Sequence, residues 1–328
     1  MGLDEFGRIK KYFRPLASIE RGSLNLLDDA AVLTVDDASK IVISTDALVE
    51  GIHFFGEEEV DLIAQKSLRT NLSDMAAMGA TPWVYTLSLS LGSVIKGTLD
   101  QWVASFVEGL KKDQDKYDVR LIGGDTVTGS GPTVISITIL GRADPRGVIT
   151  RNGASVYDDI YVSGTIGDSA AGLKIIKEPV NCLTDSDQLY LKCRYHLPKP
   201  RVKLGQALVG VASAAMDVSD GLIQDLGHLC SASSLGAIVN WPMLPLSKGV
   251  EQLLHKKAIS TSLIVNGGDD YELLFTVPKR LRTKVEAIAK ASDVVVTRIG
   301  HMINGSGVSL LDKTDRLINS IGTGFKHD

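Results

Sequence analysis

The sequence has few cysteines and no long apolar run. Its three cysteines, Cys182, Cys193 and Cys230, lie far apart and show no C-x-x-C spacing. This pattern argues against a disulfide scaffold or a zinc site and is typical of a reducing compartment. No run approaches the roughly 18 apolar residues of a membrane span, and the first residues lack the apolar stretch of a secretory signal. We therefore expect a cytoplasmic protein without membrane contact.

Charge and missing motifs exclude further classes. A formal net charge of −4, without any Lys/Arg run, gives no electrostatic footprint for nucleic acid. An anionic substrate would need metal ions or a few local basic groups to be held. The P-loop G-x-x-x-x-G-K-[ST] and the protein-kinase motif set are both absent. Nothing resembles a Ser/His/Asp or Cys/His nucleophile arrangement.

The length of 328 residues predicts two domains. In the first half, apolar alternation over 83–91 predicts a strand, and 60–78 reads as a helix. Thr98 and Gln101 form a plausible capping box that opens a second helix. The turn-rich stretch 143–153 separates the halves. We therefore place the domains at 1–145 and 146–328.

The second half mixes strands and helices in the same way. Strands are expected at 159–163, 271–277 and 294–299, and the stretch 204–215 reads as a helix. Another helix is expected near 222–234. Strands and helices interleaved in both halves indicate two α/β or α+β domains with helices flanking their sheets.

Aspartates stand out because most of them lie directly before or after an apolar run, or after a glycine pair. On the helix predicted over 60–78, Ser67, Asn71 and Asp74 form a polar stripe with i, i+4, i+7 spacing. Carboxylates with hydroxyl neighbours, and no clustered Cys or His, favour Mg²⁺ over zinc or copper. For any single aspartate, a role as helix cap or turn residue stays open. The aspartates concerned are Asp28, Asp29, Asp46, Asp74, Asp125, Asp217, Asp269 and Asp270.

Three other features are candidates for ligand contact. The run 164–172 (GTIGDSAAG) follows a strand and opens a helix, so its N–H groups either meet an anion or form a packing turn. Arg151 is the best-placed basic residue for a phosphate clamp, unless it is a surface arginine. His53 follows the Asp46 strand closely and is a candidate for substrate contact, although a single histidine more often has a structural role.

Eight motifs occur in an order that resembles the thiamine-monophosphate kinase family. The resemblance extends from about residue 5 to residue 300, and the wider superfamily includes aminoimidazole ribonucleotide synthetase, selenophosphate synthetase and a hydrogenase-maturation enzyme. The family assignment depends most on the second and third motifs. The motifs are LDDAAV (27–32), ISTDALVEGIHF (43–54), NLSDMAAMGA (71–80), LIGGDT (121–126), TRNGA (150–154), SGTIGDSAAGL (163–173), DVSDGL (217–222) and NGGDDYEL (266–273).

The resemblance implies an aminoimidazole ribonucleotide synthetase-like fold of two α/β domains with the active site in the cleft between them. It also implies a homodimer formed through the N-terminal domains, which would bind metal and ATP, with the C-terminal domain completing the site. The substrates would be ATP and thiamine monophosphate, with several Mg²⁺ ions. By motif position, the metal ligands would be Asp29, Ser44, Thr45, Asp46, Asp74, Asp125, Asp217 and Asp220. ATP would be held by Gly124, Arg151 and Ser219, and the thiamine phosphate by His53 and Asp269.

Two positions depart from the family pattern. Asp269 stands where the family usually has glutamate, so this carboxylate is one methylene shorter. Gly322 stands where many members have a tryptophan that stacks on thiamine. Either another aromatic replaces it, with Phe325 as the candidate, or acceptor binding is weaker or altered. The ATP and metal assignments depend less on these two positions than the identity of the acceptor does.

The expected reaction is direct in-line attack of a phosphate oxygen on ATP, giving thiamine diphosphate. The acceptor phosphate has its second pKa near 6, so it is ionised at neutral pH and no residue is expected to act as general base. Selenophosphate synthetase would need a reactive Cys near the N-terminus, and the hydrogenase-maturation enzyme a C-terminal Cys; the sequence has neither. Aminoimidazole ribonucleotide synthetase and a non-catalytic Mg-nucleotide sensor remain alternatives.

Overall fold

The computed structural model describes residues 9–19, 35, 40–92 and 97–318. The chain forms two compact units. Unit 1 consists of Met1–Met75 and Thr81–Ala143, and unit 2 of Ala76–Ala80 and Asp144–Asp328. Both units pair a mixed sheet with helices, as predicted. No described helix is long and apolar enough to cross a membrane.

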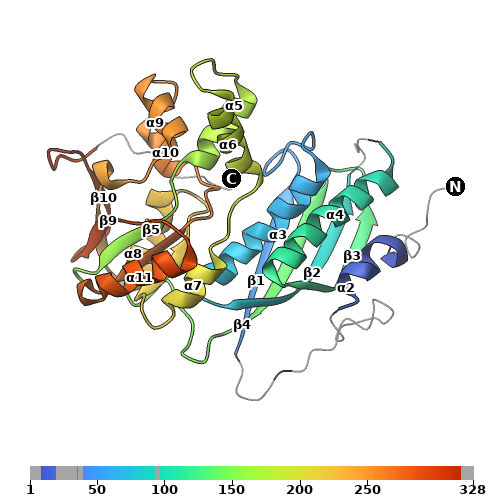
Figure 1. Cartoon of the computed structure of the whole chain (residues 1–328), viewed down its shortest axis with the longest axis horizontal. Helices are drawn as coiled ribbons and strands as arrows, with labels where there is room; N and C mark the ends of the chain where they lie inside the picture. Colours follow the sequence, from blue (N-terminus) through green and yellow to red (C-terminus); the bar gives the residue numbers. More distant parts are fainter. Residues whose placement is uncertain (1–8, 20–34, 36–39, 93–96, 319–328) are drawn as a thin grey trace. The chain divides into compact units, whose positions relative to one another are not determined.

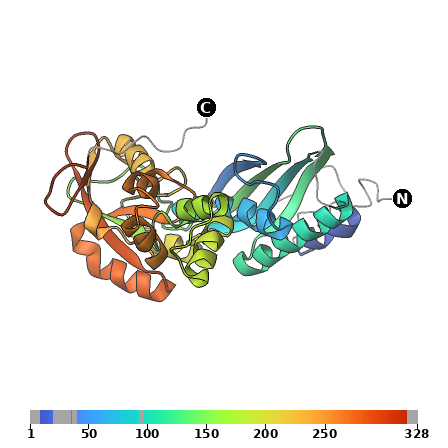
Figure 2. The same cartoon turned by 90° about the horizontal axis from the view of Figure 1, so that it is seen from above.

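Unit 1 contains one four-stranded sheet with the order β1-β4-β2-β3, in which only the β2–β3 pair is parallel. Helices α3 and α4 lie side by side along one face of it (Figures 1 and 2). The short helical segments η1 and α2 pack near α4 and β3. The elements are η1 (Ile9–Phe13), α2 (Arg14–Ala17), β1 (Ile41–Val49), α3 (Val60–Ala77), β2 (Thr81–Leu91), α4 (Leu99–Tyr117), β3 (Arg120–Thr128) and β4 (Val134–Arg142).

Local signals in the sequence explain these elements. Alternate residues of β4, Ile135, Ile137 and Ile139, are fully buried against the helices, as a two-residue period requires. The predicted capping box is confirmed at the start of α4: Gln101 N–H donates to Thr98 Oγ1 at 3.2 Å, and Thr98 N–H donates to Gln101 Oε1 at 3.0 Å. The alternation in β4 explains why one face of the sheet is buried, and the capping box explains where α4 begins.

Unit 2 contains a six-stranded sheet with the order β10-β7-β9-β5-β8-β6. All pairs are antiparallel except β10 with β7. Its elements are β5 (Asp159–Ser163), α5 (Asp168–Lys177), α6 (Asp185–His196), α7 (Val202–Leu208), β6 (Ala214–Asp217), α8 (Leu222–Ser233), β7 (Gly236–Asn240), η3 (Trp241–Met243), α9 (Lys248–His255), α10 (Thr261–Asn266), β8 (Leu273–Val277), η4 (Lys279–Leu281), α11 (Arg282–Ser292), β9 (Val296–Ile303) and β10 (Gly307–Leu311).

The sheet of unit 2 is covered on both faces. Every residue of β5 and β8 is buried, as is typical of strands packed on two sides. One apolar cluster joins the sheet to α5, α6, α8, α9 and α10, and a second joins it to α7 and α11 (Figure 1). Unit 2 is therefore a three-layer structure.

The helix predicted over 204–215 is wrong in its second half. The helix α7 ends at Leu208, and Gly210 follows with a left-handed backbone (φ 74°) that a helix cannot continue through. The next residues, Ala214–Asp217, are fully buried and form β6 by pairing with β8. Tertiary pairing overrides the helix-favouring composition here, and it places Asp217 at the end of a strand.

Candidate functional site

Three of the predicted metal ligands lie together between β1 and α3. Ser44 and Asp46 project from the same face of β1 because side chains alternate along a strand. Ser44 Oγ donates a 2.5 Å hydrogen bond to Asp74 Oδ2 on α3, and the Thr70 side chain hydrogen-bonds Asp46. Burial, followed by the charge of Asp74, raises the pKa of Asp46 to about 6, while Thr70 opposes the shift. The cluster therefore carries mutually repelling carboxylates.

Two more predicted ligands lie on the opposite face of the same sheet. Thr45 projects away from the Asp46 face, and its hydroxyl lies 2.8 Å from that of Thr138 on β4. Asp125 lies within β3, in register with Ser88, and the paired rows of β2, β4 and β1 place it on the face of Thr45. Asp125 is exposed. The predicted ligands of unit 1 that the structure describes thus form two groups, one on each face of the sheet.

The residues predicted to bind ATP and the acceptor have distinct surroundings. A Cβ on Gly124 would lie 1.9 Å from the Leu87 carbonyl oxygen, so no larger residue fits without moving the strand. His53 Nδ1 accepts the N–H of Val49 at 3.0 Å, which leaves the proton of the neutral ring on Nε2. Arg151 is exposed in unit 2. The ligand roles of these residues stay predictions.

In unit 2, the predicted residues Asp217, Ser219 and Asp220 lie between the end of β6 and the start of α8. A single oxygen, Oδ2 of Asp225, accepts the N–H groups of Ser219, Asp220 and Gly221 at 3.0, 3.1 and 3.1 Å. Burial, followed by the charge of Asp220, raises the pKa of Asp225 to about 7, and the three hydrogen bonds oppose this shift. This carboxylate fixes the loop to its helix.

The predicted acceptor residue Asp269 lies beside that loop. Its N–H donates to the Ser219 carbonyl at 2.7 Å, and the Tyr271 N–H donates to the Val218 carbonyl at 2.8 Å. The Tyr271 hydroxyl also donates to Asp269 Oδ1 at 3.2 Å. Asp269 and Tyr271 have left-handed backbones (φ 60° and 50°), which cost about 1–2 kcal/mol each in residues other than glycine. These hydrogen bonds hold the strained loop and join Asp269 directly to Ser219.

The glycine-rich run 164–172 does not act as an open anion cradle. Asp270 Oδ2 accepts the Gly167 N–H at 2.7 Å, and its Oδ1 accepts the Ser169 N–H at 3.2 Å. Burial is the main cause that raises the pKa of Asp270 to about 8, with a smaller contribution from the charge of Asp168. The chain's own carboxylate occupies the N-terminus of α5. Of the two alternatives, the packing turn holds and the phosphate contact is wrong at these two N–H groups.

Asp29 lies outside the described residues, and so do Gly322 and Phe325. The predicted metal role of Asp29 therefore stays a prediction. The same is true of the stacking role considered for Phe325.

The donors of unit 1 fit a hard cation. Asn71 Oδ1, three residues before Asp74 on α3, is buried without a hydrogen-bond partner, while its Nδ2 donates to the Ser67 carbonyl at 3.1 Å. Within the part of the chain that the structure describes, no three His, Cys, Asp or Glu side chains gather closely enough to hold a metal alone. A site with so few carboxylate ligands suits Mg²⁺, which binds one or two carboxylates and completes its coordination shell with water and phosphate.

Sequence reasoning gave no role to Asp225 and left Asp270 as an unassigned neighbour of Asp269. Asp225 had a local signal, because an acidic residue in the first turn of a helix often reaches back to the N–H groups before it. Asp270 had none, since its partners Gly167 and Ser169 lie 103 and 101 residues away along the chain.

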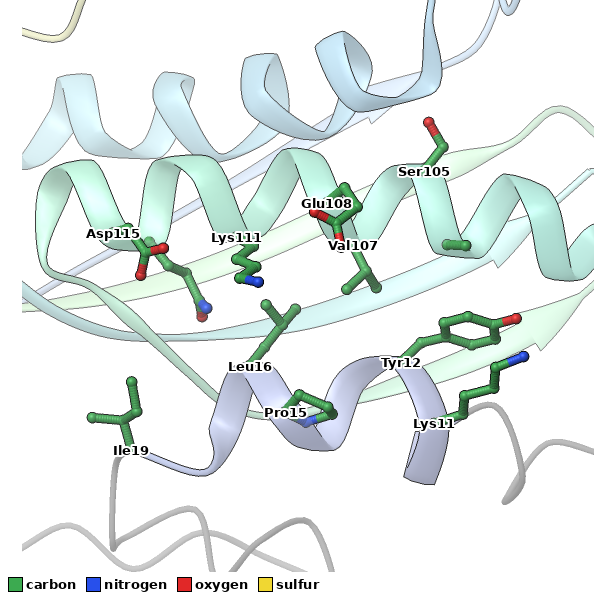
Figure 3. Close-up of a pocket in the computed structure, with 12 residues that line it drawn as sticks. Lys11, Tyr12, Pro15, Leu16, Ile19, Ser105, Val107, Glu108, Lys111 and Asp115 are labelled. Atoms are coloured by element: carbon green, nitrogen blue, oxygen red, sulfur yellow. The ribbon is translucent and has the colours of Figure 1, made fainter.

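A pocket of about 400 Å³ in unit 1 lies between the N-terminal helical segments and α4 (Figure 3). Tyr12 and Leu16 line it from one side, and Val107 and Lys111 from the other. None of the predicted site residues lines it. The pocket therefore has no part in the candidate site.

Comparisons with known proteins decide the family. The family model "AIR synthase related protein, N-terminal domain" matches residues 27–143, and "AIR synthase related protein, C-terminal domain" matches 158–313. The thiamine-monophosphate kinase of Caulobacter vibrioides is 41% identical over 308 residues, which are 93% of this chain and 86% of that protein. The chain belongs to the thiamine-monophosphate kinase family.

Solved structures of thiamine-monophosphate kinases share the fold. The enzyme from Stenotrophomonas maltophilia superposes with a TM-score of 0.83 at 37% identity, covering 94% of this chain and 97% of that one. A second structure, AaThiL complexed with AMPPCP and TMP, gives a TM-score of 0.78 at 27% identity, covering 100% and 99%. The predicted family, the two-domain fold class and the expectation of an enzyme are confirmed.

Proposed function

We propose that this chain transfers the γ-phosphoryl group of ATP to thiamine monophosphate, giving ADP and thiamine diphosphate, the last step of thiamine diphosphate biosynthesis. The observation that carries the proposal is the cluster of Ser44, Asp46 and Asp74, in which two half-buried carboxylates repel each other and a cation would relieve the repulsion. The relatives named thiamine-monophosphate kinase support the choice of acceptor. The AaThiL complex with an ATP analogue and TMP supports both substrates.

Several Mg²⁺ ions would be held by hard oxygen donors on both units. When bound, they would neutralise negative charge as two polyanions are brought together. The donors themselves are fixed by β1, α3, β3 and the β6–α8 loop. The proposed ligands are Asp29, Ser44, Thr45, Asp46, Asp74, Asp125, Asp217 and Asp220.

The rest of the mechanism is positioning. The acceptor phosphate is ionised at neutral pH, so its oxygen attacks in line without a general base. We assign ATP contacts to Gly124, Arg151 and Ser219, and acceptor contacts to His53 and Asp269. The hydrogen bond from Asp269 N–H to the Ser219 carbonyl supports this assignment, because it links an acceptor contact to an ATP contact.

The first test is ADP release from Mg-ATP with thiamine monophosphate. We expect turnover with the monophosphate, formation of thiamine diphosphate, and background rates with free thiamine or without acceptor. The direct product assay also excludes ATP hydrolysis. ATP binding without acceptor-dependent turnover would overturn the proposed acceptor and direct the search to formylglycinamidine ribonucleotide, the acceptor of a sibling enzyme.

Replacing His53 by alanine should weaken the binding of thiamine monophosphate more than the binding of ATP. The Val49 N–H donates to Nδ1, so a neutral His53 ring carries its proton on Nε2, from which we propose a hydrogen bond to a phosphate oxygen. We expect the KM for thiamine monophosphate to rise about 10- to 150-fold, since a hydrogen bond to a charged group contributes about 1.5–3 kcal/mol. Steady-state kinetics with each substrate varied in turn measure it. An unchanged acceptor KM would remove His53 from the site.

We further propose a homodimer formed through unit 1. The sheet face away from α3 and α4 exposes Ile43 (64%) and Val127 (50%), which supports an interface there. Light scattering coupled to size-exclusion chromatography tests it: a monomer at micromolar concentration would contradict the proposal. The cytoplasm remains the proposed location.

A further inference from the structure

Two buried aspartates outside the proposed ligand set hold the two loops that carry proposed ligands in unit 2. Asp225 and Asp270 are each 1% exposed. Each caps a helix whose own N-cap residue is a glycine, Gly221 for α8 and Gly167 for α5. The two carboxylates therefore replace side-chain caps that the helices lack.

Other helices of the same unit are capped more simply. The helices α6, α9 and α10 use the hydroxyls of Thr184, Ser247 and Ser260, each bonded to an N–H one turn ahead. A hydroxyl cap stabilises a helix by about 1 kcal/mol without burying a charge. Burial raises the pKa values of Asp225 and Asp270, so both carboxylates are costly compared with a hydroxyl cap. Their benefit must include more than capping.

Both carboxylates also hold the backbone of a neighbouring loop in place. Asp225 binds the N–H groups of Ser219 and Asp220 through one oxygen, which holds the backbone of the proposed ATP and metal loop on α8. Asp270 bonds to the first turn of α5 through both oxygens, and its carbonyl accepts from Arg194 Nη2 at 3.0 Å. Asp269, the proposed acceptor contact, directly precedes Asp270 in the chain. The hydrogen bonds of Asp270 to α5 therefore also restrict the position of Asp269.

We propose that Asp225 and Asp270 are positioning residues with separate effects: Asp225 sets the ATP and metal loop, and Asp270 sets the acceptor contact Asp269. The proposal rests on the function proposed above. The two loops are joined to each other by the Asp269–Ser219 hydrogen bond. The effects of the two aspartates on the KM values nevertheless differ, because Asp225 holds its loop to α8 and Asp270 holds its loop to α5.

The different bonding predicts different responses to asparagine. Asparagine at 225 can place its one carbonyl oxygen where Oδ2 accepts all three N–H groups, so Asp225→Asn should keep both KM values within about 3-fold of wild type. Asparagine at 270 accepts from only one of Gly167 and Ser169 and turns its NH₂ group toward the other N–H. Asp270→Asn should therefore displace the loop.

The experiment measures kcat and both KM values for full-length wild type, D225N, D225A, D270N and the control S247A. We expect D270N to raise the KM for thiamine monophosphate at least about 10-fold while the KM for ATP stays within about 2-fold, because small misplacements cost this much in a preorganised site. D225A should do the reverse and also raise the Mg²⁺ concentration needed for half-maximal rate. S247A should lower Tm and leave the kinetic constants unchanged.

Circular dichroism and the binding of thiamine monophosphate measured by calorimetry accompany the kinetics. The inference is overturned if D270N lowers Tm but leaves both KM values unchanged, as S247A does. It is also overturned if D225A and D270N change the two KM values equally. A wild type without acceptor-dependent turnover would instead overturn the proposed function, and this inference with it.

Discussion

Asp46→Asn is expected to lower phosphoryl transfer by about 10³-fold while making the metal-free protein more stable at neutral pH. Asparagine keeps the shape of the side chain and its hydrogen bond with Thr70. It removes the negative charge of Asp46, so that only Asp74 remains charged in this cluster to bind a cation. The rate falls because the phosphates lose charge neutralisation where the transfer occurs. The same substitution removes a half-buried charge that burial and Asp74 make unfavourable in the folded protein.

The stability effect has a defined sign. Burial and the charge of Asp74 raise the pKa of Asp46 from 3.8 to about 6, so the folded state binds this proton more tightly than the unfolded chain. Stability relative to the asparagine variant is therefore highest below about pH 4 and is lost as pH rises through about 6, by about 3 kcal/mol in total. Mg²⁺ should stabilise the wild type at pH 7.5 more than the variant, which keeps the other proposed ligands but lacks Asp46.

Urea unfolding in the presence of a chelator at pH 4.5 and 7.5, repeated with Mg²⁺ at pH 7.5, measures these changes. Asp115→Asn is the matched control, because Asp115 is exposed on α4 of the same unit and should change stability by less than about 0.5 kcal/mol. A D46N protein with near wild-type turnover would contradict the metal assignment. A metal-free D46N protein less stable than wild type at pH 7.5 would contradict the electrostatic argument.

The elements that sequence reasoning predicted well are those with a local cause. The strand over 83–91 follows from alternation of buried and polar side chains, and the start of α4 follows from Thr98 and Gln101, three residues apart. The strand β6 was missed because its four residues show no alternation and exist as a strand only by pairing with β8. Strand order was out of reach for the same reason, since β1 pairs with β4 about 90 residues later.

The residues of the candidate site were also predicted only in part. Motifs and residue types gave Ser44, Asp46 and Asp74, and the structure brings these three together. The division of the described unit 1 ligands between two sheet faces was not predicted, because the face of Asp125 depends on Ile122, an extra residue of β3 opposite Tyr85 and Thr86 of β2. A single bulge moves every later side chain to the other face, and nothing in the local sequence announces it.

Glu272→Ala should cause the largest loss of stability in unit 2, about 3–5 kcal/mol. Glu272 is fully buried, and its carboxylate accepts from Arg194 Nη2 at 2.9 Å and from Arg201 Nε and Nη2 at 2.6 Å each. Its Oε2 also accepts from Ser163 Oγ at 2.5 Å. Alanine would leave two guanidinium groups without their shared carboxylate, and Arg194 is only 2% exposed. Asp168, whose Oδ2 lies 3.7 Å from Arg194 Nε, would offset this charge only in part, and removing one partner of a buried ion pair is strongly destabilising.

The free energy of unfolding in urea measures the loss, and Glu178→Ala provides the matched control. Glu178 pairs with Lys174 at 2.7 Å, but its side chain is 71% exposed, so water screens the pair and its loss should leave the stability close to that of the wild type. Should E272A fail to fold, Glu272→Gln keeps the shape and loses only the charge, and its loss should lie between those of the other two variants. Equal losses for E272Q and E178A would show that the ion pairs of Glu272 contribute no more than a surface pair, and that packing alone holds α6 and α7 at this end of β8.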